Sequence, residues 1–479
     1  MFFRRFIAIV CALMLAASAS GGTEALLERA ETDVQRGLEM LSAARKHYIP
    51  NESSMRMYRW YNPVENSNPR ETGSVWMYTA AIEATVALME ACVELKDSGC
   101  PALYDAHSAG LSDFLSKLVD GLEWYRGTYT LTSYTRTASW SPFAVDRARR
   151  RGHADVTGKL NVYDDQQWLV RELLLAYRLT GRRDYLSLAE YLAEYIIDGW
   201  DCTLAPDGTE HGGITWGPGY SSKHACSNGP FISPLVWLSE IYKDSDETAV
   251  QYYIASDGAR LTRTMPKSEY YLMYARKVYD FQKSHLLSHW HVVYRDMMGG
   301  APISYEEVGG VTYRAYSPSS RPSGQYYPYN TGTMLSGAAD LYRVTSEGEY
   351  LSDLDGLQKS SAAFFVNPSK EHPGYMEFNV PEVPDMATPR RFNTWFYGVL
   401  LRGWTACAAH SDAADGVIAA FQKNLDYAWD NLLKEGTLPA YFLGSWNETP
   451  ADNRVEALFT FSYIANFATL ASHYISKLD

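Results

Sequence analysis

The sequence lacks the short motifs that mark many nucleophilic, phosphate-binding and metal-dependent enzymes. It has no GxSxG nucleophile elbow, no Walker phosphate loop, no intact GxGxxG and no HExxH pair. Serine hydrolases, NTPases, dinucleotide enzymes and zinc peptidases are therefore without support. His285 and His289 are four residues apart, but the charged residues around them indicate the outer face of a helix. We expect neither a metal site nor a cofactor.

Basic residues and cysteines are also few. The chain of 479 residues has 43 lysines and arginines against 56 acidic residues, a formal net charge of -13. Such a surface repels polyanions, so nucleic acid and anionic membranes are poor partners and a neutral substrate is easier to accommodate. Five of the six cysteines lie beyond residue 20. This odd number leaves at least one unpaired, and their spacing does not match a zinc site.

Long apolar runs are confined to the N-terminus. Two arginines near the start precede an apolar stretch from Phe6 to Ala17, and the small residues at its end suit signal peptidase. No later segment offers the ~20 consecutive apolar residues that cross a bilayer. We expect residues 1–19 to be a signal peptide and residues 20–479 to be exported, to the periplasm or the extracellular space.

Helical periodicity, in contrast, is abundant. The stretches "LLLAYRLTGRRDYLSLAEYLAEYI" at 173–196 and "ADLYRVTSEGEYLSDLDGLQKSSAAFF" at 339–365 share a pattern of helix, tight turn and second helix. A period of 3.6 residues predicts twelve helical segments along the chain, at 24–46, 72–96, 105–126, 164–180, 183–200, 228–243, 266–288, 330–345, 349–366, 392–410, 412–434 and 454–475. Numbered in this order, the even-numbered segments are apolar on most sides, whereas the odd-numbered ones have charged faces.

This alternation predicts an all-α protein with a single domain, an (α/α)6 toroid in which six outer helices surround six inner ones. We expect it to be a monomer. Strands are few, although "GGVTYRAYS" at 309–317 indicates a short hairpin. If the chain alternates between the rings, the inner helices run in one direction and their N-termini meet at one rim. Helix N-termini favour negative charge, so this rim suits a pocket with carboxylates at its base.

The motif "YDDQQW" at 163–168 places Asp164 and Asp165 where an inner helix begins. For an arbitrary pair, capping of exposed N–H groups is the commoner role. At a helix entrance, however, the first residue is not yet helical, and two carboxyl groups can lie on either side of a bound sugar, as glycoside cleavage requires. Two nearby acids also cannot ionise with equal ease, which supplies a proton donor and an anion together.

The order of the motifs resembles that of glycoside hydrolase family 76. These motifs are "YDDQQW", then "GWD…GGITW…KHACSNGPF", then "YNTGT…LYRVT…YL", and the resemblance covers about residues 70–475. Members of that family are endo-acting α-1,6-mannanases with an (α/α)6 fold and a retaining mechanism, so the resemblance implies this fold and activity. It also implies that Asp164 is the nucleophile and Asp165 the general acid/base. Spacing alone does not separate these two roles.

Further residues near the same rim are candidates for sugar contacts. A tyrosine and an asparagine match the family's Tyr-Asn pair and can hydrogen-bond hydroxyl groups, although the asparagine is as well suited to a turn or cap. Two glycines allow a ligand to approach the backbone, or simply form a loop. The tryptophans can stack on a sugar face, with core packing as the usual alternative. The candidates are Tyr329, Asn330, Asn228, Gly212, Gly213, Trp76, Trp168 and Trp216.

These observations favour an exported, retaining glycoside hydrolase that cleaves α-1,6-linked mannan by double displacement. One alternative is a glycan-binding protein of the same fold without activity. Another is a different (α/α)6 sugar enzyme, either an epimerase or an unsaturated-uronide hydrolase. The acidic composition argues against uronide substrates, and the scarcity of histidines near the rim argues against an epimerase.

Overall fold

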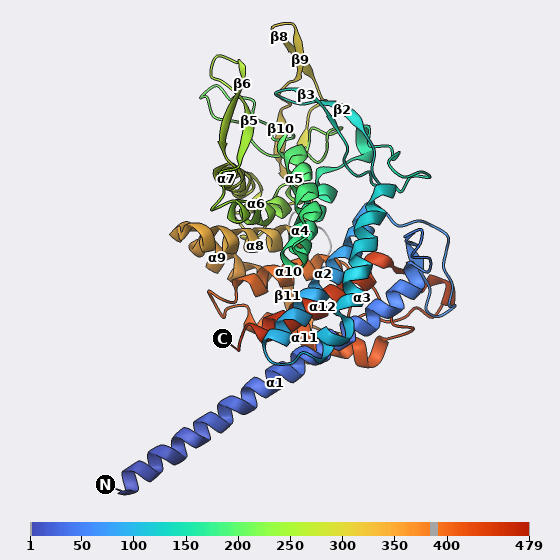
Figure 1. Cartoon of the computed structure of the whole chain (residues 1–479), viewed down its shortest axis with the longest axis vertical. Helices are drawn as coiled ribbons and strands as arrows, with labels where there is room; N and C mark the ends of the chain where they lie inside the picture. Colours follow the sequence, from blue (N-terminus) through green and yellow to red (C-terminus); the bar gives the residue numbers. More distant parts are fainter. Residues whose placement is uncertain (1, 384–390, 479) are drawn as a thin grey trace.

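Twelve α-helices dominate the computed structural model, which describes residues 2–383 and 391–478, with side chains from residue 22 onward (Figure 1). Each helix occupies one of the twelve predicted segments, with ends shifted by a few residues. The exception is α1, which begins far earlier than residue 24; the side chains of the predicted signal peptide, 1–19, lie outside the described part. The bounds are α1 Phe2–Tyr48, α2 Val75–Asp97, α3 Ala102–Gly121, α4 Tyr163–Thr180, α5 Arg183–Ile197, α6 Gly229–Ile241, α7 Lys267–Leu286, α8 Pro328–Thr345, α9 Gly348–Phe365, α10 Thr394–Cys407, α11 Asp415–Leu432 and α12 Ala457–Ile475.

The even-numbered helices form a closed inner ring, and the odd-numbered helices surround it. Each inner helix packs against the next even-numbered one, and α12 packs against α2. The apolar pattern explains the division: every residue from Gly229 to Leu238 of α6 is buried, whereas α5 buries a single face that includes Tyr185, Ala189 and Leu192. The predicted (α/α)6 toroid is therefore confirmed.

Glycines allow two inner helices to approach closely. A Cβ atom added to Gly332 of α8 would lie 2.5 Å from the carbonyl oxygen of Val399 in α10. A Cβ atom on Gly403 of α10 would lie 2.6 Å from the carbonyl oxygen of Gly332. The two backbones are thus in direct contact, which a larger residue at either position would prevent.

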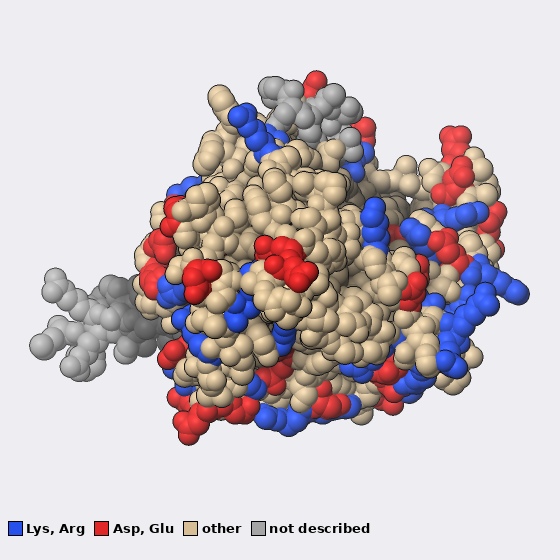
Figure 2. Space-filling view, turned by 90° about the horizontal axis from the view of Figure 1, so that it is seen from above, with Lys and Arg blue, Asp and Glu red and all other residues tan. Residues whose placement is uncertain are grey.

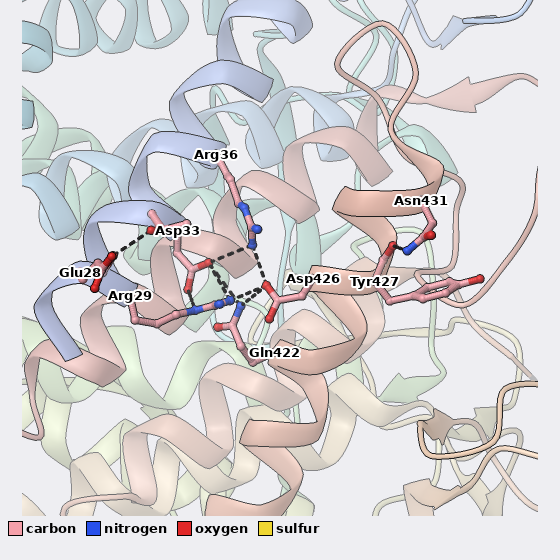
Figure 3. Close-up of polar contacts among 9 residues, drawn as sticks. Glu28, Arg29, Asp33, Arg36, Gln422, Asp426, Tyr427 and Asn431 are labelled. Atoms are coloured by element: carbon pink, nitrogen blue, oxygen red, sulfur yellow. Dashed lines mark hydrogen bonds and ion pairs between the residues drawn. The ribbon is translucent and has the colours of Figure 1, made fainter. Parts of the chain in front are cut away.

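A polar cluster joins α1 to α11, the first and last outer helices (Figure 3). Arg29 and Arg36 of α1 both contact one carboxyl oxygen of Asp426 in α11, at 2.5 and 2.6 Å. Asp33 of α1 is fully buried and accepts a hydrogen bond from the amide of Gln422 in α11, at 3.2 Å. We call these five residues the α1–α11 clasp. It completes the outer ring between segments almost 400 residues apart in the chain.

Short strands decorate the connections instead of forming a core sheet. The predicted hairpin near 309–317 is present but begins earlier, as β8 and β9. Figure 1 shows the hairpins β2–β3, β5–β6 and β8–β9 at one end of the helical body. A three-stranded sheet has the order β10-β7-β4, and two further pairs are β1–β13 and β11–β12. The bounds are β1 Trp60–Tyr61, β2 Tyr129–Thr132, β3 Thr137–Trp140, β4 Lys223–His224, β5 Thr248–Ile254, β6 Arg260–Pro266, β7 Met297–Gly300, β8 Tyr305–Val308, β9 Val311–Arg314, β10 Ser319–Ser323, β11 Val366–Pro368, β12 Met376–Phe378 and β13 Val455–Glu456.

The charge distribution agrees with the acidic composition. Viewed from above, acidic and basic side chains are interspersed around the edge of the molecule, and the middle of this face is mostly uncharged apart from one acidic cluster (Figure 2). This face therefore has no broad positive patch of the kind that binds a polyanion. Among the described helices, none is long and apolar enough to span a bilayer.

Candidate active site

The N-terminal turns of the inner helices line a cavity of about 510 Å³, which we call the rim cavity. Residues come from the starts of α2, α4, α8 and α10 and from the segment that leads into α6. The predicted convergence of inner-helix N-termini at one rim is therefore confirmed. The lining residues are Ser74, Trp76, Val145, Lys159, Val162, Asp164, Asp165, Trp168, Trp216, Tyr220, His224, Cys226, Asp296, Tyr327, Tyr329, Trp395 and Phe396.

The entrance of α4 is fixed from both sides by the two glutamines that follow the aspartate pair. The side-chain amide of Gln166 donates to the carbonyl oxygen of Phe143 at 2.8 Å and accepts from the N–H of Phe143 at 3.0 Å. The amide of Gln167 donates to the carbonyl oxygen of Ser227 at 2.7 Å. Both glutamines are fully buried. The two aspartates between this anchor and the preceding loop are thereby held in place.

Asp164 accepts hydrogen bonds at both carboxyl oxygens. Its Oδ1 accepts from the backbone N–H of Asp165 at 3.0 Å, and its Oδ2 accepts from the indole Nε1–H of Trp216 at 3.2 Å. The thiol of Cys226 also hydrogen-bonds this carboxyl group. The N-cap position of α4 belongs to Val162, in extended conformation, so neither aspartate is the N-cap residue. Both aspartates lie inside the first turn of α4, so the expectation that the first of them is not yet helical was wrong. The bond from the N–H of Asp165 is a first-turn contact of the kind that caps a helix, whereas the bond from Trp216 to the other oxygen of Asp164 is not.

The side chain of Asp165 is 8% exposed, and no donor within the described residues bonds its carboxyl group. Burial raises the pKa of both aspartates. The hydrogen bonds to Asp164 oppose this effect, and its pKa is raised to about 6. Burial and the charge of Asp164 raise the pKa of Asp165 well above its ordinary value. Asp164 thus ionises first, and Asp165 retains its proton to higher pH.

A third carboxyl group, Asp296, lies in the same cavity and was not predicted from the sequence. Burial and the charge of Asp164 raise its pKa to about 6. Its Oδ1 lies 3.9 Å from Nδ1 of His224, whose pKa burial lowers to about 4, so this imidazole is neutral at physiological pH. Asp296 immediately precedes β7 and belongs to no recognisable motif. The pairing of β7 with β4, which ends at His224, and the bond from the N–H of Ala225 to the carbonyl oxygen of Asp296 at 2.7 Å bring it to the site.

Aromatic rings form the floor and walls of the rim cavity. Trp395 lies between two predicted platforms, with ring centroids 4.9 Å from Trp76 and 5.3 Å from Trp168. The indole of Trp216 stacks on His224 at 4.7 Å. The predicted Tyr329 also lines the cavity, 5.6 Å from Trp395. Trp395 itself was missed, although its place in the first turn of an inner helix could have indicated it.

Comparison with models of known protein families identifies the family of this chain. The model of glycosyl hydrolase family 76 matches residues 153–254 and 235–469, about two thirds of the chain. The chain belongs to glycosyl hydrolase family 76. A comparison with curated proteins found no match.

Solved structures of family 76 proteins share the fold. A family 76 mannosidase, Bt3792 of Bacteroides thetaiotaomicron VPI-5482, superposes with a TM-score of 0.62 at 20% identity, over 92% of this chain and 98% of the other. The α-1,6-mannanase GH76A of Salegentibacter sp. HEL1_6 gives 0.59 at 19% identity, over 92% and 99%. An inactive variant of that mannanase, with two consecutive aspartates replaced by asparagine, was solved with α-1,6-mannotriose; it gives 0.59 at 17% identity, over 92% and 99%.

Four of the residues predicted to contact sugar do not line the rim cavity of this family 76 chain. Asn228 is buried and bonds the backbone N–H and carbonyl of Ile214 at 2.8 and 3.0 Å. Asn330 is buried, and its amide donates to the carbonyl of Arg295 at 3.4 Å, next to Asp296. These two asparagines hold segments that present lining residues.

The two predicted glycines have a packing role in the structure. Gly212 and Gly213 have φ values of 70° and 80°, which glycine adopts without strain. A Cβ atom on Gly213 would lie 2.4 Å from the ring of Phe281 in α7. The backbone approach at this position is therefore to an aromatic ring of the outer helix.

The five cysteines beyond residue 20 are all free in the structure. Cys226, which lines the rim cavity beside Asp164, has its thiol pKa raised by burial and by the neighbouring carboxylates. It is therefore a neutral hydrogen-bond donor to Asp164. The described residues contain no group of three or more His, Cys, Asp and Glu side chains suited to a metal ion.

Proposed function

We propose that this family 76 protein is an exported, retaining endo-α-1,6-mannanase. The proposal rests above all on the unequal environment of two consecutive aspartates in one cavity. Asp164 has three hydrogen-bond donors and ionises first, whereas Asp165 has none among the described residues and keeps its proton. A retaining glycosidase requires this combination of an anion and a proton donor.

In the proposed reaction, ionised Asp164 attacks the anomeric carbon while Asp165 protonates the departing glycosidic oxygen. This step forms a glycosyl ester on Asp164 and leaves Asp165 ionised. Asp165 then removes a proton from water, which attacks the anomeric carbon and releases Asp164. Donation by Trp216 and Cys226 stabilises the Asp164 carboxylate before attack and again when it departs.

The lining of the rim cavity supports a neutral sugar chain as substrate. Within the described lining, Lys159 is the only lysine or arginine, against three carboxyl groups. An anionic uronide would be repelled. The aromatic walls suit the apolar faces of pyranose rings. Solved structures of inactive variants of a family 76 α-1,6-mannanase in complex with α-1,6-mannotriose and α-1,6-mannotetrose support mannan as the glycan.

Separate substitution of the two acids tests the proposal. Asp164→Asn and Asp165→Asn should each lower cleavage of linear α-1,6-mannan by at least about 10²-fold, the lower limit for loss of a general acid. On an aryl α-1,6-mannobioside, whose leaving group needs no proton, Asp165→Asn should retain the first step and Asp164→Asn should not. The product, analysed by NMR at early times, should have the α configuration.

A matched control is Asp184→Asn, which alters an exposed aspartate on α5 that bonds Arg182. It should retain the parental rate. Full activity of either rim variant, or β-configured product, would refute the assignment. Retention of mannan without release of reducing ends by the parent protein would instead support the non-catalytic glycan-binding alternative.

A further inference from the structure

A second cavity lies at the opposite end of the inner ring. It has a volume of about 360 Å³ and is lined by later residues of the inner helices, five of which begin at the rim cavity. All six inner helices contribute to it. We call it the distal cavity. Its lining includes Glu83, Glu90 and Glu94 of α2, Arg171 and Glu172 of α4, Ser233 and Trp237 of α6, Ser336 and Asp340 of α8, Arg402 of α10, and Thr469, Ser472 and His473 of α12.

A partition separates the two cavities. On the rim side are the packed indoles of Trp76, Trp168 and Trp395. On the distal side, the guanidinium of Arg402 lies 5.7 Å from the ring centroid of Trp168 and forms an ion pair with Glu83. A ligand in the distal cavity therefore does not touch the aspartate pair.

Five of the 22 buried polar atoms that lack a hydrogen-bond partner within the described residues belong to side chains that line the distal cavity. They come from five of the six inner helices and are Glu94 Oε2, Glu172 Oε2, Ser233 Oγ, Arg402 Nη2 and His473 Nδ1. Glu172, Ser233 and His473 are at most 7% exposed. Native proteins satisfy most buried polar groups, so such a group of unpaired atoms around one cavity indicates an occupant.

The unpaired atoms and charges define the chemistry of that occupant. Two carboxylate oxygens can only accept from a ligand when ionised, and the guanidinium can only donate. Glu83 and Glu172 have arginine partners, and Asp340 pairs with Arg343. Glu90 and Glu94, one turn apart on α2, have no ion-pair partner within 4.0 Å among the described residues, although the charges of Arg171 and Arg178 act on Glu90 and the hydroxyl of Ser472 hydrogen-bonds Glu94. Burial raises the pKa of both glutamates, to about 7 for Glu94.

An open hollow connects the distal cavity to solvent. It shares Glu90, Arg171, Leu175, Trp237 and Asp340 with the distal lining. Its outer residues are Arg178, Glu240, Ile241 and Arg343. The guanidinium of Arg343 contacts both Glu240 and Asp340. A small ligand can thus enter the distal cavity through this hollow, past the charged side chains at its outer edge.

We propose that the distal cavity is a second binding site, for a small aliphatic amine in its ammonium form. An ammonium group offers three N–H donors and a positive charge. The donors match the unpaired carboxyl oxygens of Glu94 and Glu172, and the positive charge is attracted by the carboxyl groups of Glu90 and Glu94. A neutral polyol would supply no positive charge to the carboxyl groups. The volume of the distal cavity lies at the lower end of the range for small-molecule sites, which favours a small ligand.

Isothermal titration calorimetry of the purified protein with 1,4-diaminobutane tests the proposal, with 1,4-butanediol as its uncharged isostere. The diamine should bind with a stoichiometry of one, and the diol should not bind. Glu90→Gln combined with Glu94→Gln should weaken diamine binding at least tenfold. Thr469→Leu, which narrows the cavity and removes no charge, should weaken it as well.

Two controls locate the binding. Glu349→Gln, at an exposed position of α9, should leave the affinity unchanged. Asp164→Asn should also leave it unchanged, because the rim cavity is separate; loss of binding in that variant would assign the amine to the rim and overturn the proposal. Absence of binding by the parent protein, equal binding of the diol, or unchanged affinity in the Glu90/Glu94 variant would show that the distal cavity holds only water.

Discussion

The hydrogen bond from Trp216 to Asp164 should set the pH at which the enzyme becomes active. Trp216→Phe removes the indole donor, 3.2 Å from Oδ2 of Asp164, and keeps an aromatic ring. A hydrogen bond to a charged group is worth about 1.5–3 kcal/mol, and one pKa unit corresponds to about 1.36 kcal/mol. Because two other donors remain, we take the lower end of this range. The pKa of Asp164 should rise by about one unit.

The direction of the effect follows from the role of Asp164. Its carboxyl group must be ionised to attack, so kcat/KM falls as pH drops below its pKa of about 6. Raising that pKa by one unit moves the acidic limb of the profile to higher pH. At pH 5 the variant should be roughly tenfold slower relative to the parent than it is at pH 8. The basic limb reports loss of the proton from Asp165 and should move little.

The assay is a pH profile of kcat/KM on a soluble α-1,6-mannan oligosaccharide. The matched control is Trp237→Phe, which removes an indole that donates to Asp340 at 3.1 Å on the distal side. An acidic limb that stays within about 0.3 units in Trp216→Phe would refute the reasoning, since one unit is expected. An equal shift in Trp237→Phe would show that the effect is not specific to the rim.

Three other predictions concern stability and export. In urea unfolding, Asp426→Ala should lower the free energy of unfolding by about 2 kcal/mol, less than the roughly 3–5 kcal/mol for a fully buried pair because the side chain of Asp426 is 29% exposed. The control Lys359→Ala, which breaks an exposed ion pair, should lower it by less than about 0.5 kcal/mol. Equal losses in the two variants would contradict a stabilising role of the α1–α11 clasp. Gly213→Ala should lower the free energy of unfolding by about 2–5 kcal/mol, because alanine there is strained at positive φ and its Cβ overlaps the ring of Phe281. The control Gly208→Ala has a similar φ but open space around it and should cost only about 1–2 kcal/mol. Equal losses in the two variants would show that the Cβ does not overlap the Phe281 ring. N-terminal sequencing of the secreted protein should begin at residue 20, and an intact N-terminus would exclude the proposed cleavage.

Much of the fold could be predicted because it depends on local periodicity. The twelve helices follow from apolar spacing, and the difference between α5 and α6 follows from how many of their faces are apolar. The β5–β6 pair was not predicted, because strands of seven residues in a helical chain give little signal. The Asp164–Asp165 pair was found because its two members are adjacent in sequence.

Asp296 could not be found in the same way, because it reaches the rim cavity through contacts with residues distant in the chain and belongs to no repeated motif. Trp395 was missed although its place in the first turn of an inner helix could have indicated it. Gly213 shows the converse difficulty. The sequence indicated that another group approaches the backbone at this glycine. That group is the ring of Phe281, 68 positions later in the chain, which the sequence did not indicate. The sequence indicates that a residue is constrained, whereas the partner that constrains it depends on tertiary packing.

Because α11 and α12 are synthesised last, the nascent chain cannot complete either ring until nearly all of it has left the ribosome. Until then Arg29 and Arg36 of α1 lack their partner Asp426, and α2 lacks its neighbour α12. Contacts between such distant segments slow folding. The meeting of the two chain ends is therefore the step that completes both rings at once, and no shorter N-terminal part of the chain can close either of them.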